Sequence, residues 1–430
     1  MENNSAPEGR RVVVTGLGVV SSIGVGKKTF YDALAAGESG IHEITAFDAS
    51  SFPVKIAAEV RHFDINRSAE DSEDVRGIFD RKVHFGLAAF DEAYASSGVS
   101  SDALSDARTA LNLGVSLESF SIDQIASSVR DHRMDFARLY AEAMRAGASP
   151  MQTPLDTTNR ILVRRYGITG MNFVNSSACA ASAQAIGHSF RMMRRGEIDL
   201  AFCGGMDSMI NPLGVGGFSL LGALSTSNDL LGVAMRPFDA RRNGTVLGEG
   251  AAVLVLETLE RALARNAYIH AEVIGFGSSC DAYKPTDPDP EGLGAVQAMN
   301  SALHSAGLTS DAIEYINAHG TSTPKNDEIE TKAIKTVFGS RAARIPVSST
   351  KSMIGHCIAA SGAIECVASI SAFERNVIPP TINYVHKDHY CDLDYVPNTA
   401  RVWTGDRILT NSFGFGGQNA SLILQRWRSH

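Results

Sequence analysis

Basic residues and long apolar runs are scarce in this sequence. Its 39 Lys and Arg are outnumbered by 47 Asp and Glu, which gives a net charge of −8, and no run of five basic residues occurs. This balance argues against nucleic acid as the main partner. No tract approaches the roughly 18 apolar residues that span a membrane. The first eleven residues, MENNSAPEGRR, lack the apolar core of a signal peptide, so we expect a cytoplasmic setting.

Cysteine is sparse as well. Six cysteines are scattered along the chain, with no Cys-x-x-Cys pair and no zinc-ligand spacing. We therefore expect neither disulfides nor a metal site. Five of the six are interpreted as inert, namely Cys203, Cys280, Cys357, Cys366 and Cys391.

The sixth, Cys179, lies among small residues where the periodicity of the sequence changes. Residues 171–175, MNFVN, alternate and predict a buried strand, and residues 180–195 predict a helix that stops at Gly196. A thiol at such a turn meets unpaired N–H groups and the positive end of the helix dipole, and both favour the thiolate. A lone cysteine is more often a small buried side chain without a catalytic role. Reactive residues elsewhere in the sequence are therefore needed to indicate whether Cys179 is catalytic.

Strand-like and helical segments alternate along the chain, which predicts an α/β fold. Two pairs of segments repeat weakly: residues 10–22 resemble 271–283, and residues 171–208 resemble 345–380. We therefore expect two similar halves, residues 1–265 and 266–430, whose equivalent strand ends could meet. The segment TGLGVVSS argues against a dinucleotide-binding loop, because Ser21 stands where the third glycine should be.

The second half carries reactive side chains at predicted strand ends. His319 follows one strand in the segment INAHGTSTP, and Lys351 and His356 lie in the loop after another, TKSMIGH. Glu365 follows two to three turns into the next predicted helix, where its carboxylate could neutralise a buried lysine. Near the end, NSFGFGGQN forms a glycine-rich turn in which backbone N–H groups can approach a ligand closely.

Together these segments resemble the β-ketoacyl-acyl carrier protein synthases. The likeness rests on Cys179 in its small-residue setting, HGTSTP, KSMIGH and NSFGFGG, and it extends from RRVVVTGLGVVS to SLILQ. It implies a thiolase-like fold, with two duplicated halves in five α-β-α-β-α layers, and usually a dimer. It also implies an acyltransferase that condenses an enzyme-bound acyl group with a malonyl thioester on an acyl carrier protein. No cofactor is implied beyond the carrier's own phosphopantetheine arm.

The resemblance also implies roles at matching positions. Cys179 would be the acylated nucleophile, and the backbone N–H groups of Cys179 and Phe415 would form its oxyanion hole. His319 and His356 would donate N–H groups to an enolate oxygen. Lys351, paired with Glu365, would set the local field and orientation. The remaining matches are Asp327 in support of this network, Thr321 and Thr323 along the phosphopantetheine arm, Phe415 as gate of the acyl pocket, and Phe218 near its entrance.

Two segments depart from the family pattern. Residues 114–122, GVSLESFSI, replace a glycine-rich stretch beside the acyl pocket, so Glu118 and Phe120 could change the accepted chain length. Residues 68–80, SAEDSEDVRGIFD, are acidic where the family presents basic residues to an acidic carrier. Docking would then require an unusual carrier, a second and different subunit, or other basic residues, such as Arg61, Arg67, Arg241 and Arg242.

These departures leave the pathway open between fatty acid elongation and a type II polyketide or polyene system. In the second case the chain would be a ketosynthase subunit acting with a chain-length-factor-like partner. A non-catalytic chain-length-factor-like subunit is disfavoured, because Cys179, His319 and His356 are all present. A degradative thiolase is disfavoured too, because NSFGFGGQN lacks the second catalytic cysteine of that class.

Overall fold

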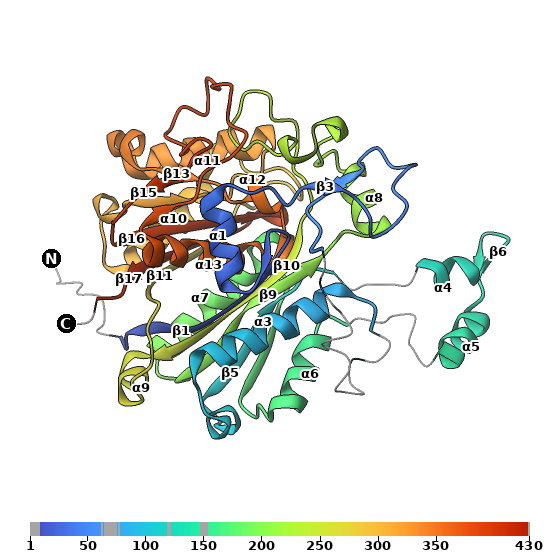
Figure 1. Cartoon of the computed structure of the whole chain (residues 1–430), viewed down its shortest axis with the longest axis horizontal. Coiled ribbons are helices and arrows are strands. Elements are labelled where there is room, and N and C mark those ends of the chain that lie inside the picture. Colours follow the sequence, from blue (N-terminus) through green and yellow to red (C-terminus); the bar gives the residue numbers. More distant parts are fainter. Residues whose placement is uncertain are drawn as a thin grey trace.

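The computed structural model describes residues 9–61, 63, 75, 78–117, 122–146 and 154–428 (Figure 1). Its main feature is one large sheet. From the N-terminal half come β1 (Val12–Ser21), β5 (Thr109–Gly114), β8 (Met171–Asn175), β9 (Leu200–Ser208) and β10 (Glu249–Thr258). From the C-terminal half come β11 (Ala271–Cys280), β12 (Tyr315–Asn317), β13 (Val347–Ser348), β16 (Arg407–Gly414) and β17 (Gln418–Arg426).

Helices cover and separate these strands. The helices of the N-terminal half are α1 (Lys27–Ala36), α3 (Arg81–Ser97), α4 (Ile122–Ser127), α5 (Phe136–Ala146), α6 (Thr157–Tyr166), α7 (Ala181–Arg194), α8 (Pro212–Leu220) and α9 (Leu259–Ala264). Those of the C-terminal half are α10 (Leu293–Ala306), α11 (Pro324–Phe338), α12 (Lys351–Ile354) and α13 (Ser361–Arg375). Two-residue strands complete the described fold: β2 (Gly24–Val25), β3 (His42–Glu43), β4 (Ile56–Ala57), β6 (Val129–Arg130), β7 (Arg133–Met134), β14 (Val377–Ile378) and β15 (Arg401–Val402).

The two halves repeat one topology. The strand order is β1-β10-β9-β5-β8 in the first half and β11-β17-β16-β12-β13 in the second, so each half places its first, fifth, fourth, second and third strands side by side. The directions match as well: the first two pairings of each half are antiparallel and the last two are parallel. The halves join where β1 pairs with β11. This duplication confirms the predicted fold class.

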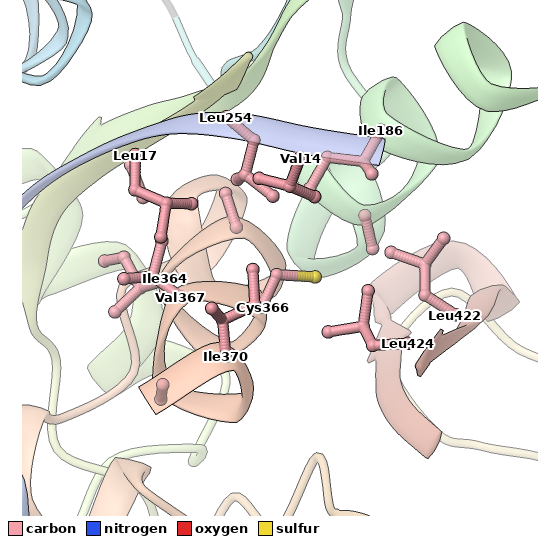
Figure 2. Close-up of a cluster of buried hydrophobic side chains, with 14 of the residues drawn as sticks. Val14, Leu17, Ile186, Leu254, Ile364, Cys366, Val367, Ile370, Leu422 and Leu424 are labelled. Atoms are coloured by element: carbon pink, nitrogen blue, oxygen red, sulfur yellow. The ribbon is translucent and has the colours of Figure 1, made fainter. Parts of the chain in front are cut away.

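Five layers follow from where the apolar side chains lie. Helices α7 and α13 lie between the two halves of the sheet, in a core shared with β1, β10 and β17. Figure 2 shows this core, with Leu17 and Leu254 facing Ile364 and Val367 of α13. Helices α3 and α6 cover the outer face of the first half, and α10 and α11 cover that of the second. Buried apolar surface on both faces of each half explains why the strands are so rich in Val, Ile, Leu and Ala.

The prediction of a buried strand at residues 171–175 was wrong. Strand β8 forms there, but it is the outer edge of the sheet, and Met171 and Phe173 are 40% and 43% exposed. Alternation in the sequence predicts a strand without revealing which strands have a neighbour on both sides. Elements α4, β6 and α5 stand away from the rest of the chain in Figure 1. Among the described residues, no helix combines the length and apolar character needed to cross a membrane.

Candidate active site

A cavity of about 300 Å³ lies where elements from both halves meet. Cys179 lies in its wall beside His319 and His356, and Phe415 borders it. One sulfur and two imidazole nitrogens thus come within 4.8 Å of one another, although their residues are far apart in the sequence. Soft divalent metals take such donor sets, but Lys351, buried next to His319, opposes a bound cation.

Cys179 occupies a strained turn between β8 and α7. The turn is a 3₁₀ segment, Ala178–Ala180, and Ala178 has a φ of 47°. The Cys179 side chain is buried, and the backbone N–H of Phe415 hydrogen-bonds its sulfur. The predicted position before a helix is confirmed, but burial outweighs the effects that favour thiolate and raises the pKa of the thiol to about 11. The resting sulfur is therefore a neutral thiol.

His356 points one ring nitrogen at this thiol. Its Nε2 lies 3.2 Å from Cys179 Sγ. Its Nδ1 accepts a hydrogen bond from the backbone N–H of Ile358 at 3.2 Å and lies 3.0 Å from the Ser361 hydroxyl oxygen. A nitrogen that accepts from an N–H carries no proton, so Nε2 carries the ring proton. Burial, and next the charge of Lys351, lower the pKa of His356 well below 6.5. The ring is thus a neutral donor that faces the cavity.

His319 is in the same tautomeric state as His356, with the ring proton on Nε2. The Nζ of Lys351 lies 3.2 Å from its Nδ1, and because an ammonium has no acceptor, Nδ1 must accept and Nε2 must carry the proton. Burial, then the charge of Lys351, lower the pKa of His319 well below 6.5. The two imidazole rings lie nearly perpendicular, with centroids 5.3 Å apart. The site therefore holds two neutral N–H donors side by side.

Lys351 is completely buried and has three partners. Its ammonium forms an ion pair with Glu365 and also donates to the backbone carbonyl of His319 at 2.7 Å. Burial raises the pKa of Glu365 to about 7, against the opposing charge of Lys351. Glu365 lies in the first turns of α13 rather than two to three turns in, because a short helix, α12, takes up the residues from Lys351. The predicted pair is nevertheless present.

The other predicted residues line the cavity or support its wall. Phe415 lies in the turn between β16 and β17, and its ring stacks on Phe218 with centroids 6.1 Å apart. Thr321 and Thr323 both line the cavity, and their hydroxyl oxygens are 2.8 Å apart. Asp327 lies behind the cavity, where its carboxylate accepts from the backbone N–H groups of Phe238 and Ser322.

Some predicted positions fall elsewhere. Glu118, Phe120 and most of the acidic segment at 68–80 lie outside the described residues. Of the basic residues considered for docking, Arg61 and Arg241 are exposed. Arg242 is only 8% exposed and pairs with Asp388, so it is not available to a partner.

Glu330, on α11, is a member of the site that was not predicted. Both of its carboxylate oxygens accept backbone N–H groups at 2.8 Å, one from His319 and one from Gly320. Burial raises its pKa to about 7, opposed first by the Gly320 N–H. Glu330 lies one turn after Asp327 on the same helix, and this spacing could have indicated that it also faces the site. No spacing rule, however, links a helical glutamate to the backbone of the preceding loop.

Comparison with known proteins identifies the family. The family model of the Beta-ketoacyl synthase N-terminal domain matches residues 9–262, and that of the C-terminal domain matches residues 270–385. The chain belongs to the beta-ketoacyl synthase family. It is similar to 3-oxoacyl-[acyl-carrier-protein] synthase 2 of Coxiella burnetii, with 43% identity over 97% of this chain and 99% of the relative.

Two solved structures extend this family likeness to the fold. The ishigamide ketosynthase/chain length factor has a TM-score of 0.84 and 35% identity over 98% of this chain and 100% of that one. A type II polyketide acyl-carrier protein in complex with its ketosynthase bound to the hexaketide has a TM-score of 0.85 and 29% identity, with the same coverage. The beta-ketoacyl synthase sequence therefore folds as its structural neighbours do.

Proposed function

We propose that this beta-ketoacyl synthase is a 3-oxoacyl-acyl carrier protein synthase, an acyltransferase that condenses a Cys179-bound acyl group with a malonyl thioester. One observation carries the proposal: two neutral imidazole N–H donors and one thiol meet in a single cavity, with His356 Nε2 3.2 Å from Cys179 Sγ. Decarboxylative condensation needs a nucleophile that holds an acyl group and donors that stabilise an enolate. The name of the Coxiella burnetii relative agrees with this chemistry.

In the first step, the sulfur of Cys179 attacks the carbonyl carbon of an acyl thioester on the carrier. The thiol first gives its proton to water, the carbon–sulfur bond to the carrier breaks on attack, and the departing carrier sulfur takes a proton from water. The negative oxygen of the tetrahedral intermediate needs donors in place before the reaction starts. The backbone N–H groups of Cys179 and Phe415 are suited to this role, because the Phe415 N–H already hydrogen-bonds the sulfur.

In the second step, a malonyl thioester loses carbon dioxide and leaves an enolate. Its charge develops on the thioester oxygen, where Nε2–H of His319 and of His356 would donate. Neutral imidazoles suit this task, because the step needs donors and no base. The enolate carbon then attacks the acyl carbonyl and releases the sulfur of Cys179, which takes a proton from water. Lys351 and Glu365 hold His319 in the donating orientation through Nδ1 and the backbone.

The outer part of the cavity suits the phosphopantetheine arm of the carrier. Thr321 and Thr323 present hydroxyl groups there, and Phe218 and Phe415 form an apolar stack beside them. Asp327 supports the loop that carries the two threonines. In this proposal residues 1–265 supply the nucleophile and residues 266–430 supply the donors. The arm belongs to the substrate carrier, so the enzyme needs no cofactor of its own.

The two steps should differ in their pH dependence. Because burial raises the pKa of Cys179 to about 11, acyl-enzyme formation should rise about tenfold per pH unit between about pH 7 and pH 9. Because both imidazoles stay neutral, carbon dioxide release should not fall as the pH rises from about 6 to 8, and ionisation of Glu330 and Glu365, whose pKa burial raises to about 7, should only increase it. Stopped-time mass spectrometry and carbon dioxide capture measure the two rates. A carbon dioxide rate that falls as the pH rises through about 6.5 would contradict the neutral-donor assignment, because it would require imidazolium donors.

We further propose that β8 pairs with β8 of a second copy. The outer edge of β8 carries unpaired backbone groups, and Met171 and Phe173 beside it are exposed apolar side chains. On α5, which stands away from the rest of the chain in Figure 1, Phe136, Tyr140 and Met144 are spaced four residues apart and are 73%, 68% and 64% exposed. Such a set is expected to be covered in the assembled protein.

Phe173→Lys is expected to convert the dimer to a monomer, because two lysines would face each other across the paired edges. Light scattering after size exclusion measures the mass. Lys28→Ala, which changes an exposed residue on α1, is the control. A wild-type protein that is monomeric alone would contradict the homodimer. If it dimerises only with a chain-length-factor-like subunit, the polyketide alternative is favoured. The name of the similar ishigamide ketosynthase/chain length factor structure is the reason for testing such a pair.

Reconstitution tests the condensing function itself. Purified protein, a series of acyl carrier thioesters and malonyl carrier are incubated together, and the carrier products are analysed by mass. The expected product is a 3-oxoacyl carrier two carbons longer than the acyl donor. The donor length that reacts fastest reports the acyl pocket. Hydrolysis of the acyl donor without elongation would contradict the proposal.

A further inference from the structure

Asp207 is a buried carboxylate that the proposed steps leave without a task. It lies at the end of β9 and is 1% exposed. Its Oδ1 accepts from the Ser116 hydroxyl at 2.8 Å and from the Ser208 N–H at 2.9 Å. Its Oδ2 accepts from the backbone N–H of Ala359 at 2.9 Å. One side chain therefore links the segment after β5, its own strand and the turn that follows His356.

The turn held by Asp207 is strained. Ile358 has a φ of 41°, a conformation that a β-branched residue adopts only when its surroundings enforce it. Its own N–H donates to Nδ1 of His356, and the next N–H along the chain, that of Ala359, donates to Asp207. The strained residue is thus fixed on one side by the imidazole and on the other by the carboxylate.

The same turn occurs in the first half, at the nucleophile. Each turn begins with a residue of positive φ, Ala178 or Ile358, continues as a three-residue 3₁₀ segment and leads into a helix. Ala359 therefore corresponds to Cys179 in the duplicated fold. In the proposed reaction, the N–H of Cys179 faces a negative oxygen that forms only during turnover. The equivalent N–H of Ala359 faces an oxygen that is already present in the resting enzyme, that of the Asp207 carboxyl group.

We propose that Asp207 is a positioning residue for His356. By holding Ala359, it keeps the Ile358 turn in the conformation whose N–H, together with the Ser361 hydroxyl, occupies Nδ1 of His356, so that Nε2 remains the protonated nitrogen facing the substrate. Its bond to Ser116 ties this arrangement to the segment that leaves β5. This role of Asp207 rests on the proposed function in one respect: the step that it affects is the release of carbon dioxide.

Asp207→Asn separates this role from a purely structural one. The amide has nearly the same size as the carboxylate but only one acceptor oxygen. In the wild type, the Ser116 hydroxyl, the Ser208 N–H and the Ala359 N–H donate to two carboxylate oxygens. Carbon dioxide release from malonyl carrier should slow by about 10- to 100-fold, while acylation of Cys179 should change by less than about threefold. Glu257→Gln is the matched control. Glu257 is equally buried, but it lies on the neighbouring strand β10, at the end far from Asp207, and is paired with Arg261 and Arg265. The control should leave both rates unchanged.

A spectroscopic readout tests the proposal without any substrate. Nitrogen NMR of histidine-labelled protein should show His356 protonated at Nε2 alone in the wild type, and a changed Nδ1 signal in Asp207→Asn. If the amide variant does not fold, Asp207→Glu, which lengthens the side chain by one methylene, should give the same split between the two rates. Equal slowing of both steps, or an unchanged His356 signal, would overturn the role of Asp207. A wild type that releases no carbon dioxide refutes the proposed function instead, and the NMR comparison still decides about Asp207.

Discussion

Cys179→Ala is expected to lower condensation by at least about 10³-fold while the protein stays folded. Among the described residues that line the cavity, Cys179 alone offers a thiol, and its sulfur is the group that His356 faces. The change removes one sulfur from a turn whose backbone is fixed by neighbouring hydrogen bonds, so the fold should remain. Intact-protein mass spectrometry after incubation with acyl carrier measures the adduct.

A second cysteine provides the matched control for this variant. Cys203 is also fully buried, on β9 in the central core, and its sulfur does not reach the cavity. Cys203→Ala should therefore keep the acyl adduct and lose only some stability through the small void it leaves. An adduct of unchanged amount in Cys179→Ala would show that another residue carries the acyl group.

His319→Ala is expected to leave acylation intact and to slow carbon dioxide release by about 10²- to 10³-fold, the usual effect of losing one oxyanion donor. The ring does not contact Cys179 through a described hydrogen bond, whereas His356 does. Loss of His319 should therefore affect the enolate more than the acyl-enzyme. Trapping of labelled carbon dioxide from malonyl carrier measures this step alone.

His319→Asn distinguishes a donor from a base. An amide donates N–H groups but has no basic nitrogen, so this variant should recover part of the rate that alanine loses. His188→Ala, at an exposed position on α7, controls for loss of an imidazole elsewhere. No recovery by asparagine, together with a rate that titrates near pH 6.5, would indicate that His319 acts as a base.

Much of the fold and site could be predicted because both are encoded locally. HGTSTP, KSMIGH and NSFGFGG each lie within one strand-to-helix or strand-to-strand connection, and the duplication brings equivalent connections to the same place. Weak internal repeats indicated that equivalent strand ends could meet, and the family resemblance implied that Cys179, His319 and His356 form one site. The Lys351 and Glu365 pair followed from the rule that a buried ammonium requires a carboxylate.

The remainder depended on contacts between distant segments. Glu330 and Asp207 act on backbone N–H groups of loops in other elements, and no side-chain spacing reports such a contact. Exposure of β8 depended on its being the last strand of the sheet, which alternation alone does not reveal. The neutral state of Cys179 followed from the depth of its burial, whereas the sequence indicated only its place before a helix.

One single-turnover measurement tests the central claim, that this cavity couples loss of carbon dioxide to removal of an acyl group from Cys179. Acyl-enzyme is prepared, freed of acyl donor and mixed with malonyl carrier, and the acyl mass on the protein is followed together with trapped carbon dioxide. The account predicts equal amounts of carbon dioxide released, acyl group lost and 3-oxoacyl carrier formed. Loss of the acyl group without carbon dioxide would contradict it, because Cys179 would then serve hydrolysis or simple transfer and the two imidazoles would hold no enolate.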